Sequence, residues 1–151
     1  MGLYSVALFV HIVGALLLFV LLTVEGVGLR VGFASAPINQ VLGPISALAV
    51  LVPGLYMMNV AWGWTGWVAV GIAAWVLIAL FGAVTGVSVM RGRMSKTAAA
   101  LSWSVRVGMA LAVVFDMTVK PDLLVAAIAV AVGAVLGAAA SLVRRREVST
   151  T

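Results

Sequence analysis

The sequence predicts an all-α protein, a polytopic transmembrane bundle of five helices with the N-terminus outside and the C-terminus in the cytoplasm. The first observation is composition. The 151 residues are 65% hydrophobic and 9% charged, whereas a soluble domain is about 45–50% apolar and about 25% charged. The second is that five runs reach the roughly 20 apolar residues that cross a bilayer. The third is that the cations gather beside alternate ends of these runs.

The five predicted spans cover about 3–29, 41–60, 66–90, 97–119 and 122–143. Pro53-Gly54 predicts a kink in the second span, which neighbouring helices can tolerate in a membrane. Pro121 separates the last two spans, because proline ends a helix or opens a new one. Residues 1–143 therefore form one helical bundle, and residues 144–151 form a short basic tail.

The orientation follows from seven cations that fall on one side of a five-span chain: Arg30, Arg91, Arg93, Lys96, Arg144, Arg145 and Arg146. Lys120 is the one cation at the opposite boundary, where Trp62, Trp64 and Trp67 gather in a tight turn. The positive-inside rule then predicts a multi-pass membrane protein with a cytoplasmic C-terminus. The first run is too long and lacks the basic flank of a cleaved signal, so it is predicted to be retained.

Composition also excludes several functions. The net charge of +5 lies at span ends, where it meets lipid headgroups, so it does not indicate nucleic-acid binding. The chain has no cysteine, which excludes disulfides and thiolate metal sites. The sequence has no phosphate-binding loop, paired carboxylates or nucleophile elbow, so it gives no candidate catalytic residue and favours a protein that is not an enzyme.

Small residues recur every four positions on two spans, at Gly82 and Gly86 and again at Gly133 and Gly137. Such faces allow close approach of helix backbones in lipid. Each could be a seam within the chain, a homo-oligomer contact or a docking face for a larger membrane complex.

Ionisable side chains inside the spans are few, and they are costly in a bilayer. Because the first and fourth spans are antiparallel, Glu25 is expected level with Arg106, and His11 level with Asp116. The interpretation we favour for Glu25 and Arg106 is a structural ion pair. The alternative is a polar track for protons or ions that also includes His11 and Asp116.

His11 is also the candidate ligand for a haem or another metal group, because imidazole is the usual axial ligand. It is the only histidine, so a second ligand would have to be a methionine. The candidates are Met57, Met58, Met109 and Met117. Asp116 and Lys120 are the residues expected to support His11 or the bound group.

Two stretches carry a resemblance to a known group of proteins: Phe9-Val10-His11-Ile12-Val13-Gly14-Ala15 and Met117-Thr118-Val119-Lys120-Pro121. They resemble small bacterial membrane proteins of unknown function that are distantly similar to the CopD copper-resistance proteins and to HemJ, the membrane protoporphyrinogen oxidase. The resemblance implies a haem b ligand at the first-helix histidine, His11, and a matching Lys-Pro at Lys120-Pro121.

Three functions remain open. The first is an accessory or assembly subunit of a larger membrane complex. The second is a haem- or metal-associated membrane protein with His11 as ligand. The third is a small proton- or ion-coupled transporter that uses the polar track.

Overall fold

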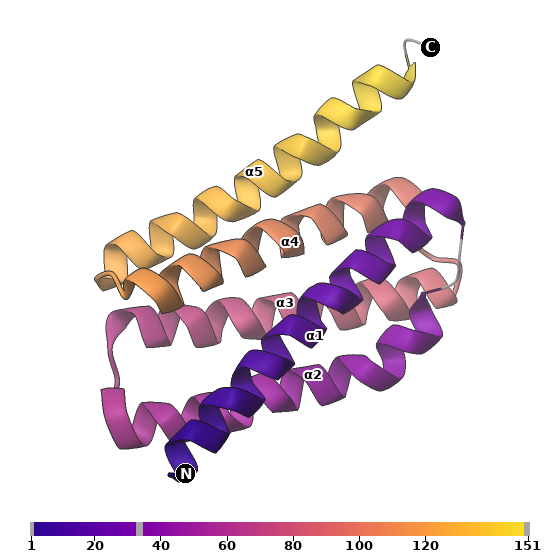
Figure 1. Cartoon of the computed structure of the whole chain (residues 1–151). Helices are drawn as coiled ribbons and strands as arrows, with labels where there is room; N and C mark the ends of the chain where they lie inside the picture. The colour runs from indigo at the N-terminus through magenta and orange to yellow at the C-terminus, as the bar shows by residue number, and fades with distance from the viewer. Residues whose placement is uncertain (1, 33–34, 150–151) are drawn as a thin grey trace.

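The computed structural model describes residues 2–32 and 35–149, and within these ranges the chain is helical apart from short connections. The elements in chain order are α1 (Leu3–Val31), α2 (Ala36–Met57), the π-helical turn η1 (Met58–Trp62), α3 (Gly66–Met90), α4 (Lys96–Val119) and α5 (Leu123–Ser149). The helices run alongside one another in alternating directions, and the two termini lie at opposite ends of the bundle (Figure 1). In these described ranges, five helices are long and apolar enough to cross a membrane. The predicted all-α class with five candidate spans is therefore confirmed.

Local signals set the helix ends. α1 ends at Gly32, whose φ of +78° is the left-handed conformation that glycine adopts without a steric penalty. α4 begins after Ser95, whose hydroxyl accepts a hydrogen bond from the backbone N–H of Ala98 at 3.2 Å. α5 begins in the same way, because Asp122 Oδ1 accepts from the N–H of Val125 at 2.9 Å.

Two helices are longer than the sequence predicted. α2 begins at Ala36 rather than near residue 41, with a proline in its first turn, where a missing N–H costs no helical hydrogen bond. It continues through Pro53 and ends in the π-helical turn η1. α5 continues past 143 to Ser149, into the predicted tail of residues 144–151, of which 150 and 151 lie outside the described residues.

Small residues bring two helix pairs into close contact. In α1, a Cβ on Gly14 would lie 2.8 Å from the backbone of Ala49 in α2. Beside it, Ser46 donates a hydrogen bond to the Gly14 carbonyl at 3.0 Å. In α4, Gly108 packs directly on the backbone of Gly133 in α5, with no room for a Cβ on either residue. This close approach gives backbone packing in lipid that larger side chains would prevent.

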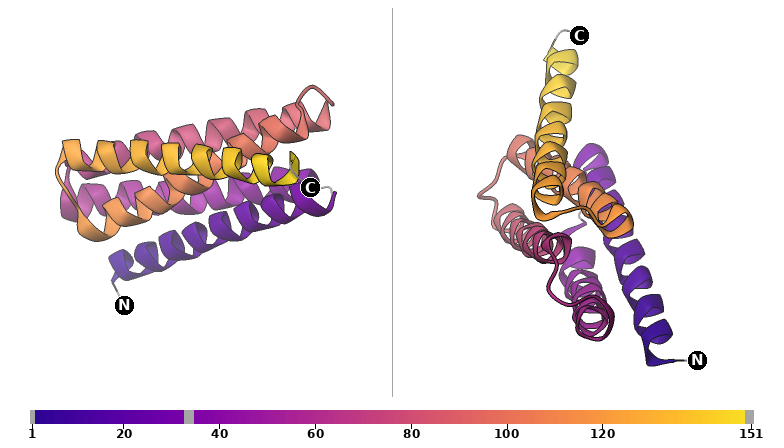
Figure 2. Two further views of the ribbon diagram at one scale, coloured as in Figure 1. Left: turned by 90° about the horizontal axis from the view of Figure 1, so that it is seen from above. Right: turned by 90° about the vertical axis from the view of Figure 1, so that its left-hand side faces the viewer.

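The Gly133 and Gly137 face of α5 is therefore a seam within the chain, with Gly137 against the backbone of Ser104 in α4. On α3, Gly82 lies against the guanidinium of Arg106, whereas a Cβ on Gly86 would meet no atom within 4 Å. Three of these four glycines therefore contact α4, and Gly86 does not. The end-on view shows α5 and α2 on opposite sides of the molecule, with α3 and α4 between them and α1 crossing alongside (Figure 2).

Candidate functional site

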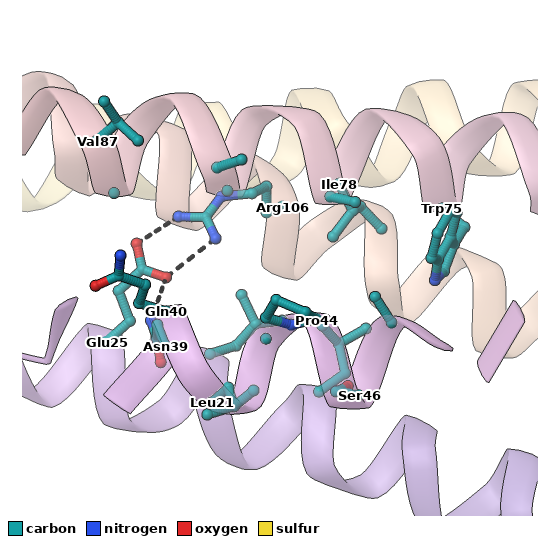
Figure 3. Close-up of a pocket in the computed structure, with 18 of the residues that line it drawn as sticks. Leu21, Glu25, Asn39, Gln40, Pro44, Ser46, Trp75, Ile78, Val87 and Arg106 are labelled. Carbon is teal, nitrogen blue, oxygen red and sulfur yellow. Dashed lines mark hydrogen bonds and ion pairs between the residues drawn. The ribbon is translucent and has the colours of Figure 1, made fainter. Parts of the chain in front are cut away.

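A buried ion pair joins α1 to α4. Arg106 donates from Nη1 to Glu25 Oε2 at 3.0 Å, and from Nη2 to the other oxygen, Glu25 Oε1. Asn39, from the first turn of α2, donates from Nδ2 to the same Glu25 Oε2 at 3.4 Å (Figure 3). The two parallel bonds are the geometry in which arginine binds a carboxylate most strongly. The structure thus brings together the two residues that the sequence placed at one level.

Some hydrogen-bonding groups around this ion pair have no partner in the ranges that the structure describes. The side chain of Arg106 is 5% exposed and that of Glu25 is 13% exposed. A guanidinium has five N–H donors, and Glu25 takes two of them. Arg106 Nε and Asn39 Oδ1 are both buried without a hydrogen-bond partner among the described residues. An unsatisfied buried polar group costs free energy, so these atoms are suited to a further acceptor and a further donor.

Trp103, one turn before Arg106 on α4, docks the two helices together. Its indole Nε1 donates to the carbonyl of Leu22 in α1 at 2.6 Å. The ring occupies the space that a side chain at position 26 would need, which is why glycine stands there. Trp103 and Gly26 therefore fix the approach at which Glu25 reaches Arg106.

Next to the ion pair lies a cavity of about 430 Å³, which we call the Arg106 cavity. Its lining comes from four helices: Leu18, Leu21, Leu22, Glu25, Asn39, Gln40, Gly43, Pro44, Ser46, Ala47, Trp75, Ile78, Ala79, Gly82, Ala83, Gly86, Val87, Met90 and Arg106. The polar groups sit mostly at one end of an otherwise apolar space (Figure 3). Pro44 on α2 and Ala83 on α3 are exposed, so the cavity opens between these two helices.

His11 binds α2 rather than α4. Its Nδ1 lies 2.8 Å from the carbonyl oxygen of Val50, and the same edge of the ring lies against Gly54. Val50 neighbours Ala49, whose carbonyl loses its helical partner because Pro53 has no N–H. Since the Val50 carbonyl can only accept, Nδ1 is the donor, and in the neutral ring with this tautomer the lone pair is on Nε2.

A second cavity, the His11 cavity, has a volume of about 680 Å³. Three methionines line it together with His11, and they are Met57, Met58 and Met117. Its walls are otherwise mainly aliphatic and aromatic, with Trp62, Trp67 and Trp75 among the lining residues. His11 Nε2 forms no hydrogen bond within residues 2–32 and 35–149. The only ring nitrogen with a free lone pair in this chain therefore belongs to a wall of the larger cavity.

Lys120 stands at the rim of the His11 cavity. Its Nζ lies 3.5 Å from the centroid of Trp62 and 5.9 Å from that of Trp67, and the two indoles meet edge to face. A cation over an indole face is attracted by the ring quadrupole, whose negative part lies on the face. The backbone of Lys120 is left-handed, with φ +53°, and it closes α4 just before Pro121.

Asp116 does not pair with His11. The sequence placed the two residues at the same level in the bundle, but they form no hydrogen bond. Asp116 is fully buried, and neither carboxylate oxygen has a hydrogen-bond partner in the described part of the chain. It shares its face of α4 with Gly108 and Ala112, which contact Gly133 of α5. It is not part of either cavity wall. Asp116 therefore cannot be assigned a supporting role beside His11.

The two cavities share a wall of three side chains: Leu18 from α1, and Trp75 and Ile78 from α3. Leu18 lies midway between His11 and Glu25 along α1. Of the polar residues that the sequence suggested as one continuous track, Glu25 and Arg106 line one cavity, His11 lines the other, and Asp116 lines neither.

Sequence reasoning missed Asn39, Val50 and Trp103. Asn39 was assigned to a loop before the second span. Val50 contributes only a backbone oxygen, which has no sequence signature. Trp103 carried a usable signal, because it stands three positions before Arg106 and this spacing places both residues on one face of α4.

No family model, curated protein or solved structure matches this chain. In the part of the chain that the structure describes, no three histidine or acidic side chains gather where they could hold a bare metal ion.

Proposed function

We propose that this chain is a haem-associated membrane protein that holds haem b in the His11 cavity with His11 as an axial ligand. The observation that carries the proposal is the hydrogen bond from His11 Nδ1 to the Val50 carbonyl. Metal-binding histidines almost always donate their second N–H to a carboxylate, carbonyl or water, which fixes the tautomer and the ring orientation. His11 is already held in that state.

The cavity wall fits the group in size and chemistry. Ligand cavities are usually about 300–1,000 Å³ and mostly apolar, and this one is about 680 Å³. Met57, Met58 and Met117 offer thioether sulfurs in the same wall, and methionine is a known axial partner of histidine. Lys120 at the rim supplies a cation for a propionate. When bound, the haem supplies one-electron redox chemistry, and the walls exclude water from it.

The resemblance of Phe9–Ala15 and Met117–Pro121 to HemJ- and CopD-like proteins supports the same proposal. The accessory role that the sequence left open would use the small-residue faces as docking surfaces. Gly133 and Gly137 contact α4, and Gly82 contacts Arg106, so these residues are used within the chain. Without those faces the docking role has no specific feature to support it.

The absorption spectrum of the gently purified protein tests this function. We expect a Soret band in the wild type and its loss in both His11→Ala and His11→Asn. The asparagine variant is the matched control for folding, because its amide can still donate to Val50 while it has no Nε2. A haem-free wild type purified with haem supplied, or a full Soret band in His11→Asn, would overturn the proposal.

We also propose the orientation expected from the sequence, in a bacterial inner membrane. Arg30, Arg91, Arg93 and Lys96 lie at the end of the bundle where α1 and α3 finish, together with the C-terminal end of α5 (Figure 1). Lys120 lies at the other end among tryptophans. The positive-inside rule supports a cytoplasmic position for the end with more cations.

A further inference from the structure

We propose that the Arg106 cavity is a second binding site, which takes a neutral, membrane-soluble carbonyl compound with its oxygen at Arg106. This site is separate from the proposed haem position. It involves none of the residues that would hold the haem, and only the partition of Leu18, Trp75 and Ile78 is common to both cavities.

The unused N–H donors of Arg106 indicate that the polar end of the ligand is a hydrogen-bond acceptor. Arg106 is 4% exposed and lines the cavity, and after binding Glu25 it still has three N–H donors. Its Nε is buried without a partner in the described ranges. A carbonyl oxygen, with two lone pairs, is the simplest group that satisfies such donors without bringing charge.

Charge argues that this head is neutral. Glu25 already balances Arg106 through two hydrogen bonds. A carboxylate or phosphate head would place a second negative charge beside Glu25 in a poorly solvated space, where like charges repel strongly. An uncharged carbonyl gains the donors of Arg106 without that repulsion.

The remaining wall requires an apolar body and a route from the lipid. Beyond the ion pair the cavity is lined mainly by aliphatic side chains and by Trp75. Its mouth lies between α2 and α3, where Pro44 and Ala83 are exposed. Both helices are candidate membrane spans, so this mouth faces the hydrocarbon region. A ligand that enters there has to be soluble in lipid.

Photolabelling with benzophenone, an apolar carbonyl compound that inserts into nearby C–H bonds on irradiation, tests the site directly. The full chain is labelled in phosphatidylcholine vesicles, and the labelled peptides are identified by mass spectrometry. We expect label on the segments of α2 and α3 that line the Arg106 cavity. Methyl undecyl ketone should compete for the site, whereas tridecane, which lacks the carbonyl, should not.

Gly86→Leu provides a variant that fills the cavity and keeps the fold. A Cβ at Gly86 meets no atom within 4 Å, and leucine favours helix over glycine. We expect at least about a tenfold loss of labelling. The leucine side chain displaces the ligand, and a tenfold loss corresponds to losing one hydrogen bond between the ligand and a charged group. Ala73→Leu adds the same side chain on an exposed part of α3 outside both cavities and should label as the wild type does.

Three results would overturn the proposal: no specific label in the wild type, undiminished label in Gly86→Leu, or competition by laurate equal to that by the ketone. The last would mean that Arg106 recognises an anionic head. The absorption spectrum should be the same in Gly86→Leu and in wild type, so failure of this site and failure of the haem proposal are distinguishable.

Discussion

Arg106 and Glu25 place opposite charges between two candidate spans, α4 and α1. Their contribution to the stability of the fold depends on both charges being present. A buried pair gains little over apolar residues of the same shape, because desolvation offsets the attraction. Losing one partner is different, since it leaves the other charge buried and uncompensated. Asn39 contributes one long hydrogen bond of 3.4 Å and cannot replace the carboxylate.

We therefore expect Glu25→Gln to lower the free energy of unfolding by about 3–5 kcal/mol. The double variant Glu25→Gln with Arg106→Gln should be more stable than this single variant, because it removes both charges. Unfolding by sodium dodecyl sulfate titration from mixed micelles gives both values. A single variant no less stable than the double would show that the pair has no such dependence.

Trp103 offers a second test at the scale of one residue. Trp103→Phe keeps an aromatic ring against Gly26 and removes the hydrogen bond to Leu22. We expect a loss of about 0.5–1.5 kcal/mol in the free energy of unfolding. In the same titration, a loss well above this range would mean that ring packing, rather than the hydrogen bond, is the main contribution of the indole.

The candidate site could be predicted only in part, and the reason is geometric. Sequence spacing gives the level of a residue along a helix, which brought Glu25 to Arg106. At about 100° per residue, Asp116 lies about 80° around α4 from Arg106, so a shared level with α1 does not turn it towards His11. The true partner of His11 is a backbone carbonyl near Pro53, and every residue carries such a group.

At the scale of the helix, the seam between α4 and α5 depends on glycine. Gly108→Ala places a Cβ on the backbone of Gly133, which cannot move aside as a side chain would. We expect a loss of about 1–3 kcal/mol in the free energy of unfolding. Gly86→Ala is the matched control, since its Cβ meets nothing within 4 Å, and it should be neutral or stabilising by up to about 1 kcal/mol. Equal losses in the two variants would contradict the seam.

Helix boundaries were predictable where the chain marks them with turn residues. α3 runs from Gly66 to Met90 as expected, between a tight turn at Gly63 and another at Gly92. The start of α2 was missed because Asn39 and Gln40 interrupt the apolar run just after the helix begins. The end of α5 was missed for a related reason, since a backbone helix need not stop where the apolar run does.

At the scale of the whole molecule, orientation can be tested because the chain has no cysteine of its own. Trp64→Cys and Met94→Cys place single thiols at opposite ends of the bundle. In intact cells, a membrane-impermeant maleimide should label the first and should reach the second only after lysis. The reverse pattern would invert the proposed orientation.

The partition of Leu18, Trp75 and Ile78 has a thermodynamic consequence. These three side chains line both cavities, so a change of rotamer in any of them alters the shape of both. Occupants of the two cavities are then linked: whatever factor one applies to the affinity of the other, it experiences in return. Replacing Leu18 with alanine should weaken the coupling between the two cavities, and the smaller factor that remains should still be equal in both directions.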